Sequence, residues 1–189
     1  MSFSRWALFL SGRGSNAEAL FEMFGDLDIA VCVSSRKNAY GLKRAERWGV
    51  PSLVLDKNPS WQELTKDLRR RRVNRIFLLG FMKILPAEFV QDWQGQIWNL
   101  HPSMLPAYPG KNAIEASYQD GASMGVTIHE VTAEMDAGPR LLQFKVAEAA
   151  SDNKKGVHHF SLAEAKTVIS QAEQRLVREL ARRRDQQWI

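Results

Sequence analysis

The chain has little of what small secreted domains and membrane proteins depend on. Its 189 residues include one cysteine, Cys32, so no internal disulfide can form. Cys32 lies in the apolar run 29–33, which favours a small buried hydrophobe over a reactive thiol. No stretch approaches the roughly 20 apolar residues of a membrane helix, and the apolar segment near the first residue is too short for a secretory signal. We therefore expect a cytoplasmic protein with no membrane partner.

What is present is the composition of an ordinary globular domain. Hydrophobic residues make up 44% and charged residues 25% of the chain, close to the averages for folded domains. A chain of this length buries roughly 70% of its unfolded surface, enough for a self-sufficient core. This excludes a disordered regulator, and we see no linker, repeat or low-complexity segment. We expect one domain over residues 1–189.

The charge balance favours anionic ligands without choosing among them. There are 26 Lys and Arg against 21 Asp and Glu, a net charge of +5, which raises the local concentration of phosphates, carboxylates or nucleic acid. The densest basic segments are 66–75 and 182–184. They are interpreted as solvated helix faces or helix ends, because no interleaved aromatic residues supply stacking platforms for a nucleic acid. We therefore expect small-molecule partners and no nucleic acid.

Short apolar runs alternate with helical stripes over the first hundred residues. Strands are predicted at 6–10, 29–33, 52–55, 76–79 and 96–100, with helices between them at 17–24, 42–48 and 61–68. This alternation predicts an α/β fold, Rossmann-like and doubly wound, in which helices cover both faces of a mostly parallel sheet. Beyond Pro102 the pattern predicts a short helix at 113–118, two strands at 126–131 and 141–146, and a long amphipathic helix at 162–183.

The glycine-rich loop 11–16, Ser-Gly-Arg-Gly-Ser-Asn, follows the first predicted strand. Ligands of open parallel sheets bind at the carboxyl ends of strands, and free N–H groups there can cradle a phosphate. The loop is not a dinucleotide fingerprint, because Ala17 stands where the third glycine is required. Two interpretations stay open: a phosphate site, or a plain turn with Ser15 or Asn16 as the helix cap.

Asn99 and His101 alternate at the end of a predicted strand, so their side chains share one face. An amide that stabilises negative charge and an imidazole that moves protons can serve one reacting carbonyl. Without other context, such a pair is more often structural. Asp136 lies in a turn-rich segment and is either a turn residue or a carboxylate that orients His101, and His129 is left open between core and site. No histidine has metal-site spacing, the pair at 158–159 included, so we expect no metal.

Four segments together carry a resemblance. The run 97–110, IWNLHPSMLPAYPG, resembles the signature of the folate-dependent formyltransferases, and the loop 11–16, the segment 80–85 and the segment 131–139 accompany it in the family's order. The resemblance covers about residues 5–146. The length is similar to that of the single-domain members, which formylate glycinamide ribonucleotide in purine biosynthesis.

The resemblance implies that an amine attacks the formyl group of formyl-tetrahydrofolate, the co-substrate. It implies an oxyanion donor in Asn99, a general acid in His101, and in Asp136 an orienting carboxylate or water-mediated proton acceptor. The loop residues that match the family's phosphate site are Gly12, Gly14, Ser15 and Asn16. The residues that match its folate site are Met82, Lys83, Ile84, Leu85, Asn99, Thr132, Ala133, Glu134, Met135 and Asp136.

The sequence departs from the family at three places. Arg13 stands where the family commonly has Asn, and Lys83 where it commonly has Arg. The family's C-terminal Glu-His pair, which reads the substrate's amine end, has no match in 156–164, where Glu164 is the candidate replacement. Another amine, such as a nucleotide-linked amino sugar, therefore remains an alternative acceptor, and a non-catalytic nucleotide- or RNA-binding module is a third hypothesis. A monomer and a homodimer are equally compatible with the sequence.

Overall fold

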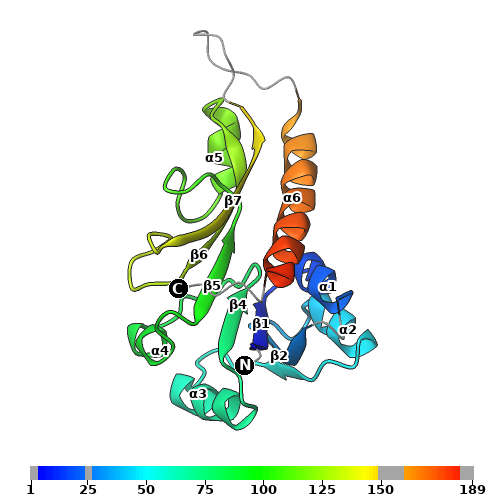
Figure 1. The fold of residues 1–189 in the computed structure, drawn as a ribbon, viewed down its shortest axis with the longest axis vertical. Helices are drawn as coiled ribbons and strands as arrows, with labels where there is room; N and C mark the ends of the chain where they lie inside the picture. Colours follow the sequence, from blue (N-terminus) through cyan, green and yellow to red (C-terminus); the bar gives the residue numbers. More distant parts are fainter. Residues whose placement is uncertain (1–3, 24–26, 149–159, 184–189) are drawn as a thin grey trace.

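The computed structural model describes residues 4–23, 27–148 and 160–183. One seven-stranded sheet runs through it in the order β3-β2-β1-β4-β5-β6-β7 (Figure 1). Its strands are β1 (Arg5–Leu10), β2 (Asp28–Ser34), β3 (Ser52–Val54), β4 (Arg75–Leu78), β5 (Ile97–His101), β6 (Met124–Glu130) and β7 (Arg140–Ala147). The helices are α1 (Ser15–Phe21), α2 (Tyr40–Arg47), α3 (Trp61–Arg70), α4 (Ala87–Asp92), α5 (Ala113–Gln119) and α6 (Leu162–Arg182). The predicted fold class is confirmed.

Strand direction divides the sheet in two. The first five strands are mutually parallel, whereas β6 is antiparallel to β5 and β7 is antiparallel to β6. The parallel strands are joined through helices, as crossover connections require. β6 and β7 are joined by the loop 131–139, which is too short for a crossover and therefore leaves the two strands antiparallel. The sheet is therefore mostly parallel with an antiparallel end.

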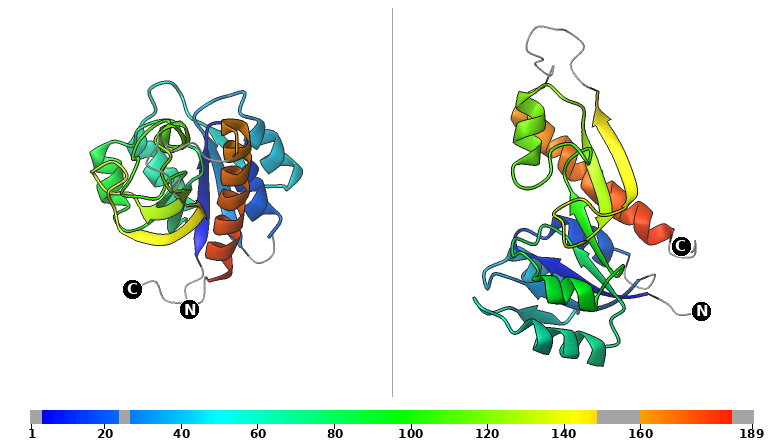
Figure 2. Two further views of the ribbon diagram at one scale, coloured as in Figure 1. Left: turned by 90° about the horizontal axis from the view of Figure 1, so that it is seen from above. Right: turned by 90° about the vertical axis from the view of Figure 1, so that its left-hand side faces the viewer.

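Two hydrophobic cores lie on opposite faces of the sheet, and β1 shows why. Its alternate residues Trp6, Leu8 and Leu10 belong to one core, which α1, α2 and α6 cover. Ala7 and Phe9 belong to the other core, which α3 and α4 cover. This period of two is the alternation that a sheet buried on both faces requires. Figure 2 shows helices on both sides of the sheet.

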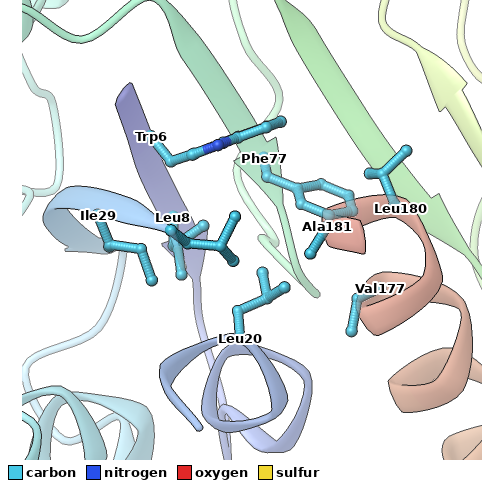
Figure 3. Close-up of a pocket in the computed structure, with 9 residues that line it drawn as sticks. Trp6, Leu8, Leu20, Ile29, Phe77, Val177, Leu180 and Ala181 are labelled. Carbon is cyan, nitrogen blue, oxygen red and sulfur yellow. The ribbon is translucent and has the colours of Figure 1, made fainter. Parts of the chain in front are cut away.

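The long helix α6 closes the first core. It begins with a capping box, in which Ser161 and Glu164 exchange hydrogen bonds. The predicted apolar stripe, Ile169, Ala172, Leu176 and Leu180, is buried. A small cavity of about 10 Å³ lies beneath the end of the helix (Figure 3). It is lined by apolar side chains such as Leu8, Leu20 and Val177. A cavity this small with no polar lining stays dry.

The elements differ from the predictions in a few places. The helix α4 was not predicted, because its six residues follow Pro86 and are too few for a visible stripe. Strand β5 ends at His101, one residue later than predicted, so this histidine is part of the strand. Phe24, assigned to the first helix, lies outside the described residues. Cys32 is fully buried, and burial raises the pKa of its thiol to about 12, which confirms an inert hydrophobe. No described helix is long and apolar enough to cross a membrane.

Candidate active site

The end of β5 and the facing stretch of β6 carry four polar side chains on one face. In the antiparallel register Asn99 lies opposite His129, and His101 lies opposite Thr127. The neighbours Trp98 and Leu100 point the other way, into the core beneath α6. The predicted pairing of Asn99 with His101 on one face is therefore present, and the sheet adds two partners from a strand about 30 residues later.

Asp136 reaches this face from the loop between β6 and β7. Its Oδ2 accepts a hydrogen bond of 2.7 Å from the Gly110 N–H and lies 3.4 Å from Nδ1 of His101. Its Oδ1 lies 3.4 Å from Nε2 of His129 and accepts a hydrogen bond, also 3.4 Å, from the Asn99 amide. The structure thus brings the three predicted residues, Asn99, His101 and Asp136, together within hydrogen-bonding reach.

The carboxyl of Asp136 is held in its charged form. The pKa of Asp136 is lowered from 3.8 to about 2, and the contact with His129 is the largest cause. The Gly110 N–H and the nearby His101 ring also lower this pKa, and together the three contacts outweigh the desolvation that would raise it. Its backbone has a φ of 53°, in the left-handed region that Asp and Asn tolerate better than most residues. Asp136 is thus an ionised acceptor at neutral pH.

His101 is placed to handle a proton. Its Nε2 donates a hydrogen bond of 2.9 Å to the backbone carbonyl of Tyr108, since that oxygen can only accept. Its Nδ1 faces the ionised Asp136, so a doubly protonated ring finds an acceptor at each nitrogen. The ring is buried, so this arrangement is little screened by water.

His129 is a member of the site that the sequence left open. Its Nδ1 donates to the Glu130 carbonyl at 2.8 Å, and its Nε2 lies 3.2 Å from the Asn99 amide nitrogen and 3.4 Å from Oδ1 of Asp136. The ring is 1% exposed, as a core residue would be, yet it contacts Asn99 and Asp136 directly. Its alternation with Thr127 on one strand was the available sequence signal.

Loop 102–110 supplies Tyr108 and Gly110, and β6 and β7 hold it in place. The buried Thr127 hydroxyl donates to the Ser103 carbonyl at 2.7 Å and accepts from the Leu105 N–H at 3.3 Å. Gln143 of β7 donates to both the Thr127 hydroxyl and the Leu105 carbonyl. Sequence reasoning missed Thr127 and Gln143, because no motif marks residues that act by supporting a loop.

The glycine-rich loop 11–16 contains one position that only glycine can fill. Gly14 is the N-cap of α1 with a φ of 72°, and a Cβ there would lie 2.5 Å from the Cα of Gly41. Gly12, by contrast, has open space around it. No side chain caps α1, so neither Ser15 nor Asn16 is the helix cap, and the choice between a phosphate site and a plain turn stays open. The close approach of α2 gives the loop its shape.

Glu173 of α6 joins this loop and was also missed. The Asn16 amide donates to its carboxylate at 3.0 Å, and burial raises the pKa of Glu173. The expected replacement for the missing Glu-His pair, Glu164, instead bonds Ser161 at the start of α6. The role of Glu164 as the replacement stays a prediction, and the carboxylate that contacts the loop is that of Glu173, in the middle of the helix. Residues 158–159 lie outside the described residues.

Apart from Asn99 in β5, the residues assigned to folate lie on two loops with exposed apolar side chains. Seven large hydrophobic residues are exposed in the described structure, and three of them, Met82, Ile84 and Met135, are on the loops after β4 and β6. The Met82 N–H donates to the Ser11 hydroxyl at 2.8 Å, which ties the first of these loops to the glycine-rich loop. The Lys83 ammonium donates to the Lys57 carbonyl. Exposed apolar side chains beside polar groups are what an aromatic ligand with a polar edge requires.

Within the ranges that the structure describes, no three His, Cys, Asp or Glu residues are arranged to hold a metal ion. The polar cluster around Asp136 consists of an amide donor, two imidazoles and one ionised carboxylate. This set can stabilise an oxyanion and transfer protons beside it.

Comparison with known proteins gives consistent matches. Residues 4–173 match the formyl transferase family. The chain is 36% identical over 166 residues to the trifunctional purine biosynthetic protein adenosine-3 of Drosophila melanogaster, covering 79% of this chain and 12% of that protein. It is 34% identical over 150 residues to the phosphoribosylglycinamide formyltransferase of Bacillus subtilis, covering 74% of this chain and 77% of the relative.

Solved structures agree with the sequence matches. The crystal structure of phosphoribosylglycinamide formyltransferase from Anaplasma phagocytophilum superposes with a TM-score of 0.84 at 34% identity, covering 96% of this chain and 88% of that one. The chain thus spans about an eighth of the trifunctional relative and most of the bacterial proteins.

Proposed function

This chain belongs to the formyl transferase family, and we propose that it transfers a formyl group from formyl-tetrahydrofolate to the primary amine of glycinamide ribonucleotide. The observation that carries the proposal is the convergence of Asn99, His101 and an ionised Asp136 on one face of β5. Relatives named phosphoribosylglycinamide formyltransferase support the choice of acceptor. We propose residues 1–189 as a single formyltransferase domain.

In the proposed reaction the amine nitrogen attacks the formyl carbon directly. The Asn99 amide, which donates to Asp136 and lies beside His129 in this structure, turns one N–H to the oxygen that becomes negative. His101 turns its Nε2–H from the Tyr108 carbonyl to the departing folate nitrogen and donates that proton as the carbon–nitrogen bond breaks. The amine's surplus proton passes through water and Asp136 back to the His101 ring, because a carboxyl with a pKa of about 2 relays a proton and does not keep it. The products are the formamide and tetrahydrofolate, and no covalent enzyme intermediate is needed because both substrates are held together.

The substrate sites follow the same layout. We assign the acceptor's phosphate to the loop of Gly12, Gly14, Ser15 and Asn16, with Glu173 reading the adjoining part of the acceptor. We assign the folate to the loops of Met82, Lys83, Ile84 and Leu85 and of Thr132, Ala133, Glu134 and Met135, next to Asn99 and Asp136. The apolar side chains of Met82, Ile84 and Met135 support this assignment, because a pterin is flat and largely apolar on its faces. A cytoplasmic location and a monomeric or homodimeric state stay predictions.

The test is a comparison of acceptors. Purified protein is given formyl-tetrahydrofolate with glycinamide ribonucleotide, or with a nucleotide-linked amino sugar, and the absorbance of the released folate is followed. We expect turnover with glycinamide ribonucleotide and loss of about 10²- to 10³-fold in Asn99→Ala, as for removal of one oxyanion donor. Turnover only with the amino sugar would replace the acceptor. No transfer to either, with tight and salt-dependent RNA binding, would favour the non-catalytic module.

A further inference from the structure

Both ring nitrogens of His101 contact residues that have a left-handed backbone. Its Nε2 donates to the Tyr108 carbonyl at 2.9 Å, and its Nδ1 lies 3.4 Å from Oδ2 of Asp136. The φ angles are 56° at Tyr108 and 53° at Asp136. Elsewhere in the described ranges, Arg72 and Asn112 are the only non-glycine residues with a positive φ. The two acceptors that face one buried ring therefore share a conformation that few residues adopt.

Tyr108 is the less expected of the two acceptor residues. Asp and Asn tolerate the left-handed region because their short polar side chains form local hydrogen bonds, whereas a bulky aromatic residue is an outlier there. Such a backbone costs free energy, persists only where the surrounding structure stabilises it, and is concentrated at functional sites. Contacts outside residue 108 must therefore keep its carbonyl against His101.

The backbone on both sides of Tyr108 is already bonded. The Ala107 carbonyl accepts from the Ser103 hydroxyl at 2.7 Å, and the Gly110 N–H donates to Asp136 at 2.7 Å. The Tyr108 carbonyl lies between these two contacts, so a change of φ at residue 108 would turn it from His101 or separate Gly110 from Asp136. The left-handed backbone is what allows one short segment to contact both.

The side chain of Tyr108 stabilises this backbone through Asp120. The Tyr108 hydroxyl donates to Oδ2 of Asp120 at 3.0 Å. Burial and this hydrogen bond raise the pKa of the hydroxyl, so it stays a donor at neutral pH. Asp120 is the C-cap of α5, and its N–H donates to the Ala116 carbonyl at 3.0 Å. The acceptor of the Tyr108 hydroxyl is thus fixed to a helix end outside the loop.

We propose that Tyr108 and Asp120 are positioning residues for His101, because their hydrogen bond stabilises the left-handed backbone that presents the Tyr108 carbonyl to Nε2. A carbonyl can only accept, so it keeps a proton on the nitrogen from which His101 donates in the proposed function, on which this inference rests. Neither residue is assigned a contact with a substrate. Loss of their hydrogen bond should therefore lower kcat and leave substrate binding unchanged.

The first test separates kcat from KM. Tyr108→Phe and Asp120→Ala each remove the hydrogen bond. Each should lower kcat by about tenfold, as for one hydrogen bond to a charged group, while the KM of both substrates changes by less than about twofold. The double variant should lose no more than either single variant, because both remove the same contact. Asp120→Asn keeps an oxygen that accepts from the hydroxyl and should retain kcat within about threefold.

A matched pair of variants tests the backbone itself. Tyr108→Asn and Tyr108→Leu introduce side chains of similar size, and neither has the hydroxyl. Asn adopts a left-handed backbone more readily than Leu, so Tyr108→Asn should have the higher kcat. Tyr118→Phe is the control, because it removes a tyrosine hydroxyl of α5 that donates at 2.8 Å to a partner outside the site, the Phe160 carbonyl. It should leave kcat unchanged.

A second measurement needs no turnover. Nuclear magnetic resonance of isotope-labelled protein detects the Nε2–H proton of His101, which exchanges slowly with water while it is buried and hydrogen-bonded. The signal should be present in the wild-type protein and in Asp120→Asn. In Tyr108→Phe and Asp120→Ala it should weaken through faster exchange, which a bond that serves stability alone would not cause.

Wild-type kcat in folded Tyr108→Phe and Asp120→Ala overturns the proposal, even if their Tm is lower. The same holds for a loss in Asp120→Asn equal to that in Asp120→Ala, for an equal loss in Tyr118→Phe, and for a wild-type protein without the Nε2–H signal. If the wild-type protein transfers no formyl group, the exchange measurement still decides whether Tyr108 and Asp120 position His101. In that case only the proposed function fails.

Discussion

Replacing Asp136 with Asn separates a catalytic carboxylate from a turn residue. The substitution keeps the size of the side chain and an oxygen that can accept the Gly110 N–H. Asn tolerates the backbone φ of 53° as well as Asp does, so the loop need not move. What is lost is one negative charge that lies 3.4 Å from a nitrogen of each of two histidines.

The structure sets the size of the expected effect on stability. In the folded protein the pKa of Asp136 is about 2, against an ordinary value of 3.8, and the side chain is only 11% exposed. That difference corresponds to about 2 kcal/mol of stability from the charged form. Because the folded pKa is the lower one, the contribution is present above about pH 4 and is lost as the pH falls through about 2.

The assay measures the free energy of unfolding of wild type and Asp136→Asn by urea denaturation at several pH values. At pH 7 the variant should be less stable by about 2 kcal/mol, and the difference should shrink towards zero near pH 2. Turnover at pH 7 should fall by orders of magnitude, with the KM of both substrates little changed, because the loss lies in the transition state.

Two results would refute this reasoning. A stability difference that is independent of pH would mean that the charge of Asp136 is not what the fold stabilises. Unchanged turnover with an unmoved pH profile would make Asp136 a turn residue and remove it from the proposed mechanism.

Four further tests address other parts of the site. His101→Ala should lower kcat by about 10²- to 10⁴-fold while circular dichroism shows an intact fold, and near-normal kcat in the folded variant would exclude a general acid. Gly14→Ala should lower the Tm by several degrees, because its Cβ meets backbone at 2.5 Å, whereas Gly12→Ala has free space and should not; equal Tm values would contradict this packing. Thr127→Val leaves the Ser103 carbonyl and the Leu105 N–H without their hydrogen-bond partner. Both kcat and the free energy of unfolding should therefore fall, the free energy by about 1–3 kcal/mol. A change in kcat alone would argue for direct contact of Thr127 with substrate. Glu173→Gln should raise the KM of the acceptor but not that of the folate, and an equal rise in both would place Glu173 outside the acceptor site.

Features that depend on neighbours in the chain were accessible from the sequence. The strand at 76–79 follows from its short apolar run, and the shared face of Asn99 and His101 and the stripe of α6 follow from periodicities of 2.0 and 3.6 residues. Gly14 was accessible as one of the glycines of the loop 11–16, whereas its left-handed backbone and its contact with Gly41 came from the structure. The family signature in 97–110 then indicated a chemistry for these residues.

Partners from distant parts of the chain were decided by the tertiary structure alone. The contact of Asn99 with His129 spans 30 residues, and that of Asn16 with Glu173 spans 157. No local pattern encodes such pairs, because they depend on the register of β6 against β5 and on where α6 crosses α1. The sequence by itself therefore determined the layers and the residues that carry the proposed chemistry. The packing of the whole chain decided which side chains keep Asp136 ionised, which orient the site residues and which hold the loop 102–110 in place.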